Sequence, residues 1–338
     1  MNNLMKNYLL SSTKLLDLII KLAEGGSVFY PVIEDNKAHL VKFDKEKEFN
    51  PNFIKIRTAE NMKHFLFPSR STVAKFPTDA QDKSKIQYLF GVKNCDLRGL
   101  DVYDRVFTKW EPLDLLYQEK RENATIISAD CPEPEDCCFC TLVGLKPYAE
   151  GISDINFTQV ASGFLFEVFT KKGEALIDKF QDVFKEVSKD DEKERDKIRQ
   201  EAIKKLNKIN EKPLAQDLAA LVEKADTKAI HSSRNECVEC FACLHACPTC
   251  YCFLLSDYQV GKNIERVRTW DACYYGAYAR VGGGANPRGK MDERFWNRFQ
   301  CKFNYFSQYE KIFACSGCGR CYRGCSALID IRKILWQL

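Results

Sequence analysis

The chain has 338 residues, 45% hydrophobic and 29% charged, which is typical of a soluble globular protein and long enough for two domains. Its 51 Lys and Arg nearly balance its 47 Asp and Glu, and the net charge of +4 argues against a nucleic-acid-binding protein, which needs a basic stripe. The chain has no run of 18 apolar residues, so no membrane helix is predicted, and Met1–Leu10 lacks a signal-peptide pattern. We therefore expect the protein in a reducing, oxygen-poor cytoplasm.

The first part of the chain predicts alternating helices and strands. A helix is expected over Thr13–Ala23, where apolar residues recur at helical spacing before two glycines. Short branched or aromatic runs predict strands, and two further helices are expected between them. The strands are Ser27–Ile33, Ala38–Phe43, Ile86–Val92, Ala124–Asp130 and two within Asn156–Thr170, and the helices are Asp101–Trp110 and Pro112–Gln118. Residues 1–178 are therefore expected to form a mixed α/β domain.

The rest of the chain changes character twice. Residues 179–233 are charge-dense, with opposite charges three or four residues apart, as in Glu194–Lys197 and Glu201–Lys205, which favours a solvated helical connector. Residues 234–338 are rich in cysteine and predict a bacterial-ferredoxin-like module with a large insert between its two motifs. The expected fold class is α+β or α/β with this module appended.

Two cysteine motifs with one spacing dominate the C-terminal module. Each reads C-x2-C-x2-C-x3-C, and three thiolates at that spacing can bind one side of a 4Fe–4S cube while the fourth ligates the other cube. One cluster is therefore expected at Cys237, Cys240, Cys243 and Cys325, and the other at Cys315, Cys318, Cys321 and Cys247. Zinc is the alternative, but a zinc site is built from two C-x2-C pairs and does not require the third and fourth cysteines of each motif. Two adjacent one-electron centres predict electron transfer.

A second set of cysteines lies in the N-terminal domain. Cys95 follows one predicted strand, and the segment CPEPEDCCFC follows another. Because ligand sites in open sheets lie at strand ends, two such loops can converge on one point. The expected third cluster uses Cys95, Cys131, Cys138 and Cys140, and Cys137 points elsewhere. A zinc site or reduced thiols are the alternatives. With four irons in each of two or three cubes, iron and sulfide should reach about eight to twelve each per chain.

The insert between the motifs holds four more cysteines and many aromatic residues. Its cysteines are interpreted as buried structural thiols, with a further metal site as the alternative: Cys250, Cys252, Cys273 and Cys301. The aromatic residues are expected to pack a core that keeps water from the clusters. No His, Ser or acidic set has the pattern of a catalytic centre, and Val281–Gly289 fits no nucleotide-binding motif.

Together these segments resemble the 4Fe–4S dicluster family that includes the beta subunit of sulfhydrogenase and the corresponding iron–sulfur subunit of anaerobic sulfite reductase. The matching pieces, in the family's order, are GVKNCDLRGLD, CPEPEDCCFC, CVECFACLHACPTCYC, WDAC and CSGCGRCYRGC. The chain departs from the family at Cys301, where a His is frequent, at the charged segment before Cys237, and at the additional Cys137.

The resemblance implies a cytoplasmic electron-transfer subunit without a substrate site of its own. Its implied partners are a flavoprotein that handles NAD(P)H and a catalytic subunit: a hydrogenase, a sulfite reductase or a heterodisulfide-reductase-like protein. The alternative is a self-contained oxidoreductase with a flavin or small substrate in the N-terminal domain. A missing nucleotide-binding fingerprint disfavours it.

Overall fold

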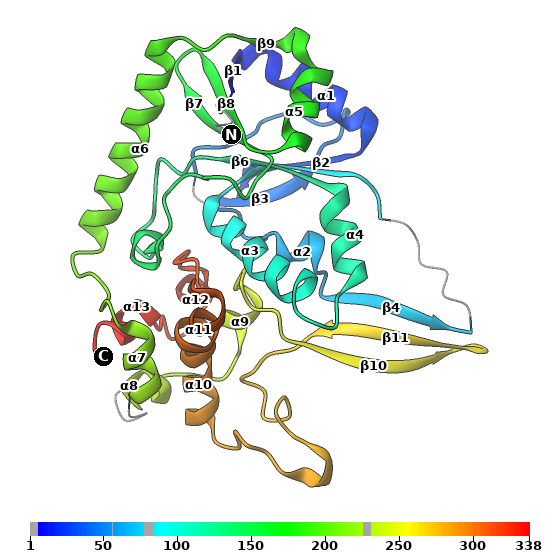
Figure 1. Cartoon of the computed structure of the whole chain (residues 1–338), viewed down its shortest axis with the longest axis vertical. Helices are drawn as coiled ribbons and strands as arrows, with labels where there is room; N and C mark the ends of the chain where they lie inside the picture. Colours follow the sequence, from blue (N-terminus) through cyan, green and yellow to red (C-terminus); the bar gives the residue numbers. More distant parts are fainter. Residues whose placement is uncertain (1–5, 56, 78–83, 226–230) are drawn as a thin grey trace.

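An eight-stranded sheet forms the N-terminal part of the computed structural model, which describes residues 6–55, 57–77, 84–225 and 231–338 (Figure 1). The strand order is β3-β2-β5-β6-β7-β8-β1-β9. The strands are β1 (Asn7–Leu10), β2 (Ser27–Glu34), β3 (Lys37–Lys42), β5 (Gln87–Val92), β6 (Ala124–Ala129), β7 (Ile155–Val160), β8 (Gly163–Val168) and β9 (Phe184–Lys185). All six strands predicted from the sequence are present within two residues of the predicted limits.

The middle of the sheet is parallel, because β2, β5, β6 and β7 pair in the same direction. β6 is buried along its whole length, as its unbroken run of apolar and branched residues predicts. Cys95 follows β5 and Cys131 follows β6, so two adjacent parallel strands deliver both cysteines to one edge of the sheet. The two cysteine loops therefore begin at neighbouring strands, as their convergence on one point requires.

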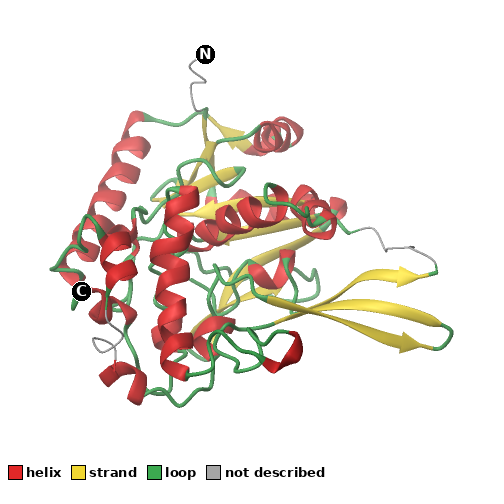
Figure 2. Ribbon diagram, turned by 60° about the horizontal axis from the view of Figure 1, so that its bottom comes forward, coloured by secondary structure: helices red, strands yellow, loops and turns green. Residues whose placement is uncertain are grey.

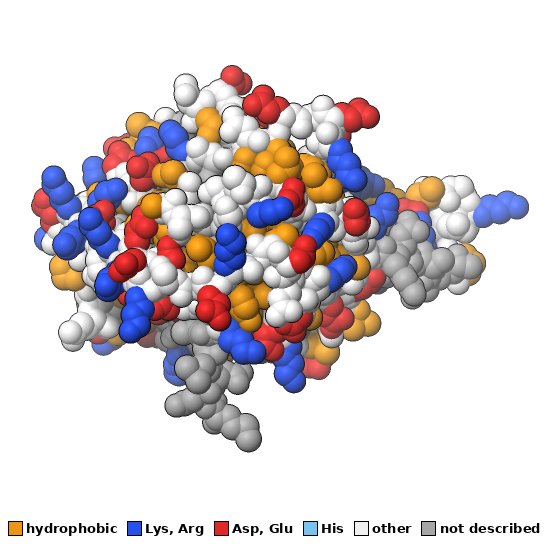
Figure 3. Space-filling model, turned by 90° about the horizontal axis from the view of Figure 1, so that it is seen from above, with side chains coloured by type: hydrophobic (Ala, Val, Ile, Leu, Met, Phe, Trp, Pro, Cys, Tyr) orange, Lys and Arg blue, Asp and Glu red, His pale blue; other side chains and the backbone are white. Residues whose placement is uncertain are grey.

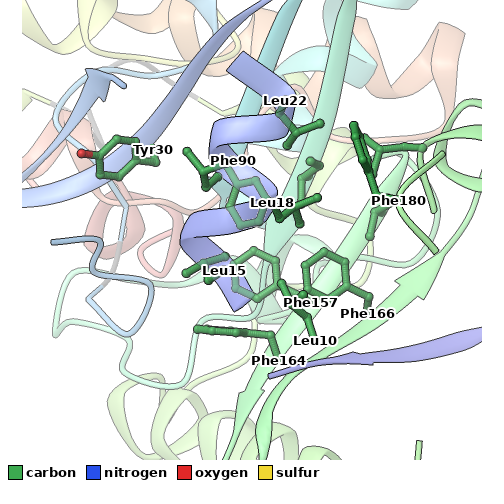
Figure 4. Packing of buried hydrophobic residues seen from close by; sticks show 14 of the residues in the cluster. Leu10, Leu15, Leu18, Leu22, Tyr30, Phe90, Phe157, Phe164, Phe166 and Phe180 are labelled. Atoms are coloured by element: carbon green, nitrogen blue, oxygen red, sulfur yellow. The ribbon is translucent and has the colours of Figure 1, made fainter. Parts of the chain in front are cut away.

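Helices of the N-terminal part pack their apolar faces on the sheet. Leu15, Leu18 and Leu22 lie one turn apart on α1 and are buried in one cluster with Phe90 and Phe157 (Figure 4). α3 begins earlier than predicted, so that Cys95 lies in its first turn. The helices are α1 (Leu15–Gly25), α2 (Lys63–Leu66), α3 (Asn94–Thr108), α4 (Leu115–Asn123) and α5 (Lys171–Lys179), with the short turns η1 (Ser12–Lys14), η2 (Cys140–Val143) and η3 (Gln181–Val183).

The charged segment after this domain is helical, as predicted, but one of its sides is buried against the sheet (Figure 1). On α6 (Lys189–Ile209), the Arg199 Nε donates to Asp130 Oδ2 at 2.7 Å, and the same guanidinium pairs with Glu167 of β8. Leu206 is fully buried. The expectation of a wholly solvated helix is wrong on this side, because two carboxylates of the sheet draw Arg199 inward. The connector continues with α7 (Leu218–Lys224) and α8 (His231–Asn235).

Short helices and loops make up the C-terminal module. They are α9 (Ala242–His245), η5 (Gly282–Gly284), α10 (Met291–Phe299), η6 (Gln300–Tyr305), α11 (Phe306–Glu310), α12 (Arg320–Arg323) and α13 (Ile331–Leu335). Aromatic side chains of the insert fill its core, as predicted, among them Tyr274, Phe295, Trp296, Phe299 and Phe303, although Tyr305 is exposed. Phe139 and Leu218 join this core, so the module packs with the rest of the chain. No helix of the described residues has the length and apolar character to cross a bilayer.

A three-stranded arm projects from the body of the protein (Figures 1 and 2). It is formed by β4 (Arg70–Phe76), β10 (Phe253–Val260) and β11 (Asn263–Trp270), in the order β10-β11-β4. The arm was not predicted, because β4 belongs to the N-terminal part and pairs with a hairpin of the insert nearly two hundred residues later. Leu254, Tyr258 and Val260 on it are exposed.

Candidate metal centres

One cavity collects the last cysteine of the first motif and three cysteines of the second. It is lined by Cys247, Cys315, Cys318 and Cys321. The loop that carries the last three depends on Gly317 and Gly319, whose φ angles of 61° and 72° are rare for residues with a Cβ. The structure therefore brings together the four residues of one expected ligand set. Their assignment to a single cube stays a prediction.

The other expected set lies at the molecular surface. Cys240 is exposed, and the other three cysteines are half-buried: Cys237, Cys243 and Cys325. Burial raises the pKa of Cys237, and negative charge on the neighbouring Cys325 raises it further. Burial raises the pKa of Cys243 as well, and Cys325 again contributes. Cys325 is therefore close to two cysteines of the first motif, and its place as the fourth ligand of their cube stays a prediction.

Two buried cations face the cavity around Cys247. The Lys302 Nζ donates to Cys247 Sγ at 3.3 Å, to Thr249 Oγ1 at 2.7 Å and to the Ala314 carbonyl at 3.1 Å. Burial opposes the charge of Lys302, but the thiolates around it, Cys247 first, raise its pKa well above the usual value. Arg298 is equally buried, and the thiolates of Cys243 and Cys321 raise its pKa despite that burial. Sequence reasoning missed both, although each lies within three residues of Cys301.

The N-terminal cysteines converge on a second cavity. It is lined by Cys95 from α3, Cys131 after β6, Cys138 from the loop before η2, and Cys140, the first residue of η2. Burial raises the pKa of Cys140 to about 12, so a bare thiolate there needs a compensating cation or metal. Cys137, which was expected to point elsewhere, is not among the described residues that line this cavity.

Arg57 supplies positive charge to the N-terminal cavity. Its guanidinium nitrogens donate to Cys137 Sγ at 3.7 Å and to Cys138 Sγ at 3.9 Å. Burial disfavours the charge, but the thiolates of Cys318 and then Cys138 raise the pKa of Arg57. No sequence signal marks Arg57, because it is remote in sequence from every cysteine.

The two cavities adjoin each other. Cys318 lines both of them. The Phe139 N–H donates to the Gly317 carbonyl at 2.8 Å, and a Cβ on Gly317 would lie 2.5 Å from the backbone nitrogen of Cys140. Gly317 is therefore required both for its left-handed conformation and for this close approach between two cysteine loops.

A buried ion pair joins the C-terminal cysteine segment to the first turn of α3, which carries Cys95. Arg320, which follows Gly319, donates to both carboxylate oxygens of Asp96 at 2.7 and 3.0 Å and to the Thr58 carbonyl at 2.7 Å. Asp96 is adjacent to Cys95, and both charged side chains are about 5% exposed. Because each charge would be costly if left unpaired, the pair holds the N-terminal cysteine loop against the C-terminal module.

No three His, Cys, Asp or Glu side chains in the described part of the chain are placed to hold a single metal ion. In a 4Fe–4S cube each thiolate binds a different iron, whereas the four thiolates of a zinc site share one ion at about 2.3 Å. Zinc at the N-terminal set would give one ion and no sulfide, so metal and sulfide analysis distinguishes it from a cube.

A hollow of about 300 Å³ lies away from the cysteines, between the sheet and α6. Its lining includes Phe53, Asp130, Phe157 and Ile198. The alternative function would place a flavin or substrate in a hollow of this kind in the N-terminal domain.

Paired four-cysteine motifs, folded around two neighbouring sites, define an iron–sulfur protein of the dicluster class. Residues 236–329 match the family described as "4Fe-4S dicluster domain", and such a domain holds two 4Fe–4S clusters. Over 325 residues the chain is 32% identical to the sulfhydrogenase 2 subunit beta of Pyrococcus furiosus, and the match covers 93% of each chain. The chain belongs to the 4Fe–4S dicluster family that includes this subunit.

Proposed function

We propose that this chain is the electron-transfer subunit of a multi-subunit oxidoreductase. It passes electrons between a flavoprotein that uses NAD(P)H and a catalytic subunit, which is a hydrogenase, a sulfite reductase or a heterodisulfide-reductase-like protein. One-electron transfer is the chemistry that 4Fe–4S clusters supply. The observation that carries the proposal is the contact between the N-terminal cysteine cavity and the dicluster module, with Cys318 on the wall of both cavities.

The N-terminal set is proposed as a third 4Fe–4S site that extends the relay. Cys95, Cys131, Cys138 and Cys140 line one cavity, and Arg57 faces it with a buried positive charge. A cluster with four thiolate ligands carries net negative charge, which a buried guanidinium compensates. Hydrogen bonds to the sulfurs and nearby charge also set cluster potentials, so Arg57 is expected to raise the potential of this site.

The surface around the first motif supports a partner at the other end of the relay. Cys240 is exposed, and two exposed apolar side chains are close in sequence to other cysteines of this set: Val238, 64% exposed, next to Cys237, and Leu328, 57% exposed, three residues after Cys325. A protein partner that covered these residues would bring its own redox centre close to the exposed cluster site. Exposed apolar residues beside a functional group are typical of such contacts.

The relative's name supports partners of this kind, because it is designated a subunit of a sulfhydrogenase. We expect the complex in the cytoplasm. Nucleic acid is not an expected partner: on the face drawn in Figure 3, Lys and Arg side chains alternate with Asp and Glu and form no continuous basic stripe.

The proposal is tested by purifying the tagged chain anaerobically from its own cells. Flavoprotein and catalytic subunits should co-purify with the wild type, and Val238→Glu should weaken their recovery at least about tenfold because it places a charge in the apolar contact. Leu16→Glu is the matched control, since Leu16 is also an exposed apolar residue but lies on α1. Iron content should be unchanged in both variants. A wild-type monomer that reduces a small molecule without partners would instead support the alternative function and its hollow beside α6.

The third site makes a separate prediction about iron. Cys138→Ala should lower iron and sulfide by about four atoms each per chain, because one cube is lost, and should leave the C-terminal clusters in place. Cys137→Ala is the matched control, because Cys137 is adjacent in sequence and equally buried but is not a proposed ligand. Iron, sulfide and zinc are measured on anaerobic protein. Equal iron in Cys138→Ala and the wild type would contradict the third cluster and leave the N-terminal domain as a docking scaffold.

A further inference from the structure

Four cysteines remain outside the three proposed cluster sites, and three separate segments bring them together. Cys250 and Cys252 precede β10, Cys273 follows β11, and Cys301 lies in the π-helical turn η6. The hairpin of the arm joins the first two segments at its base, where the Asp271 N–H donates to the Cys252 carbonyl at 3.0 Å. The first three of these cysteines therefore lie together at the base of the arm.

The sulfur atoms of this set contact one another. The Cys273 thiol donates a hydrogen bond to the Cys252 sulfur. Cys301 is close to the same sulfur, and Tyr251, which lies between Cys250 and Cys252 in the sequence, donates a hydrogen bond to Cys301. Cys273 is buried, and the other two are half-buried.

Buried lysines lie beside members of the set. The Lys302 Nζ donates to Cys247 Sγ at 3.3 Å, and Cys250 and Cys301 are also close to it. Lys63 lies near the sulfurs of Cys250 and Cys252. Only 2–3% of each lysine is exposed. Positive charge on Lys302 would compensate the net negative charge of a cluster bound beside it.

Two hydroxyl groups also point at these sulfurs. Tyr278 donates a hydrogen bond to Cys252, and Tyr251 donates one to Cys301. Hydroxyl donors favour the thiolate over the thiol. Hydrogen bonds to the ligand sulfurs are also one of the means by which a protein adjusts the potential of an iron–sulfur cluster.

We propose that Cys250, Cys252, Cys273 and Cys301 hold a fourth iron–sulfur cluster, beside the site that contains Cys247. On assembly each thiol loses its proton and each thiolate binds one iron. The set repeats the pattern of the N-terminal cavity, in which one C-x-C pair joins two single cysteines from other elements. Zinc sites typically use C-x2 to C-x4 spacing, so the C-x-C pair favours a cluster.

The location gives this fourth site a role. The Cys250 thiol donates a hydrogen bond to the Cys247 sulfur, and Lys302 is close to both sulfurs and to Cys315. The cavity around Cys247 would thus have cluster sites on three sides, which makes it a branch point of the relay. The site lies at the base of the arm, on which Leu254, Tyr258 and Val260 are exposed.

The inference is tested on the full-length chain, reconstituted anaerobically with iron and sulfide. Wild-type protein should hold about sixteen irons per chain, four for each of four cubes. Cys252→Ala and Cys273→Ala should each lose about four irons and four sulfides, while Cys137→Ala should lose none. Native mass spectrometry of the wild type gives the same count without any variant, so that a misfolded variant does not decide the result.

Two results would overturn the inference. One is unchanged iron in both variants, with about twelve irons in the wild type and the four thiols open to alkylation in its native state. The other is one zinc per chain that disappears in Cys273→Ala while iron stays constant. The test distinguishes this inference from the proposed function. If Cys138→Ala loses iron and Cys252→Ala does not, the fourth cluster is absent but the relay of three sites still stands.

Discussion

Replacing Cys247 with alanine is expected to remove about four iron atoms per chain while sparing the surface site of Cys237, Cys240 and Cys243. Cys247 belongs to the first motif by sequence, yet it lines the cavity of Cys315, Cys318 and Cys321. Its loss should therefore damage the cube that the other motif begins. Lys302, which donates to Cys247 at 3.3 Å, would lose a sulfur partner as well.

The two cubes can be told apart by their exposure. The cavity around Cys247 is buried, whereas Cys240 is exposed, so an iron chelator should remove the surface cube first and the buried one slowly. In Cys247→Ala the slow phase of iron release should be smaller, and in the matched variant Cys325→Ala the fast phase should be smaller. Loss of the fast phase in Cys247→Ala would show that each motif ligates its own cube, and the crossed assignment would then be wrong.

Replacing Arg320 with glutamine is expected to destabilise the folded protein by about 3–5 kcal/mol, the usual effect of removing one partner from a buried ion pair. Asp96 would be left without its guanidinium while only 4% exposed, and the Thr58 carbonyl would lose a donor. Since Asp96 adjoins Cys95, the N-terminal cluster site should loosen first. Thermal melting of anaerobic protein, followed by the visible absorbance of the clusters, measures the effect.

Arg323→Gln is the matched control for that change. Arg323 lies on the same short helix and pairs with Glu135 and Asp136, but its side chain is 51% exposed. Exposed ion pairs contribute about 0–1 kcal/mol, so its melting temperature should change little. The double variant Arg320→Met with Asp96→Leu should recover part of the loss, because no unpaired charge remains. Equal, small effects of Arg320→Gln and Arg323→Gln would mean that the pair does not hold the two cysteine loops together.

Most of the sheet domain could be predicted from the sequence. Buried parallel strands have continuous apolar runs, and Gln87–Val92 and Ala124–Ala129 are of this kind. The helix α1 could also be predicted, because its apolar residues recur at helical spacing. The arm was not predictable in this way, since β4 has no partner near it in sequence and pairs with β11 only in the folded chain.

The charged connector shows where composition misleads. Dense opposite charges on 189–209 predict a helix, and α6 is one. Its partial burial depends on Arg199 meeting Asp130 and Glu167, which come from strands far away in sequence. Charge pattern alone cannot distinguish a solvated arginine from one that pairs with buried carboxylates.

The sequence by itself determined the class of chemistry, because the spacing within each cysteine motif is a local property that already limits which metal centre three thiolates can bind. Only the tertiary structure decided how the centres relate to one another. The approach of Gly317 to Phe139, the pairing of Arg320 with Asp96, and the gathering of Cys252, Cys273 and Cys301 all join segments distant in the chain. Contacts of this kind arise from packing and from the pairing of buried charges, which spacing along the chain does not encode.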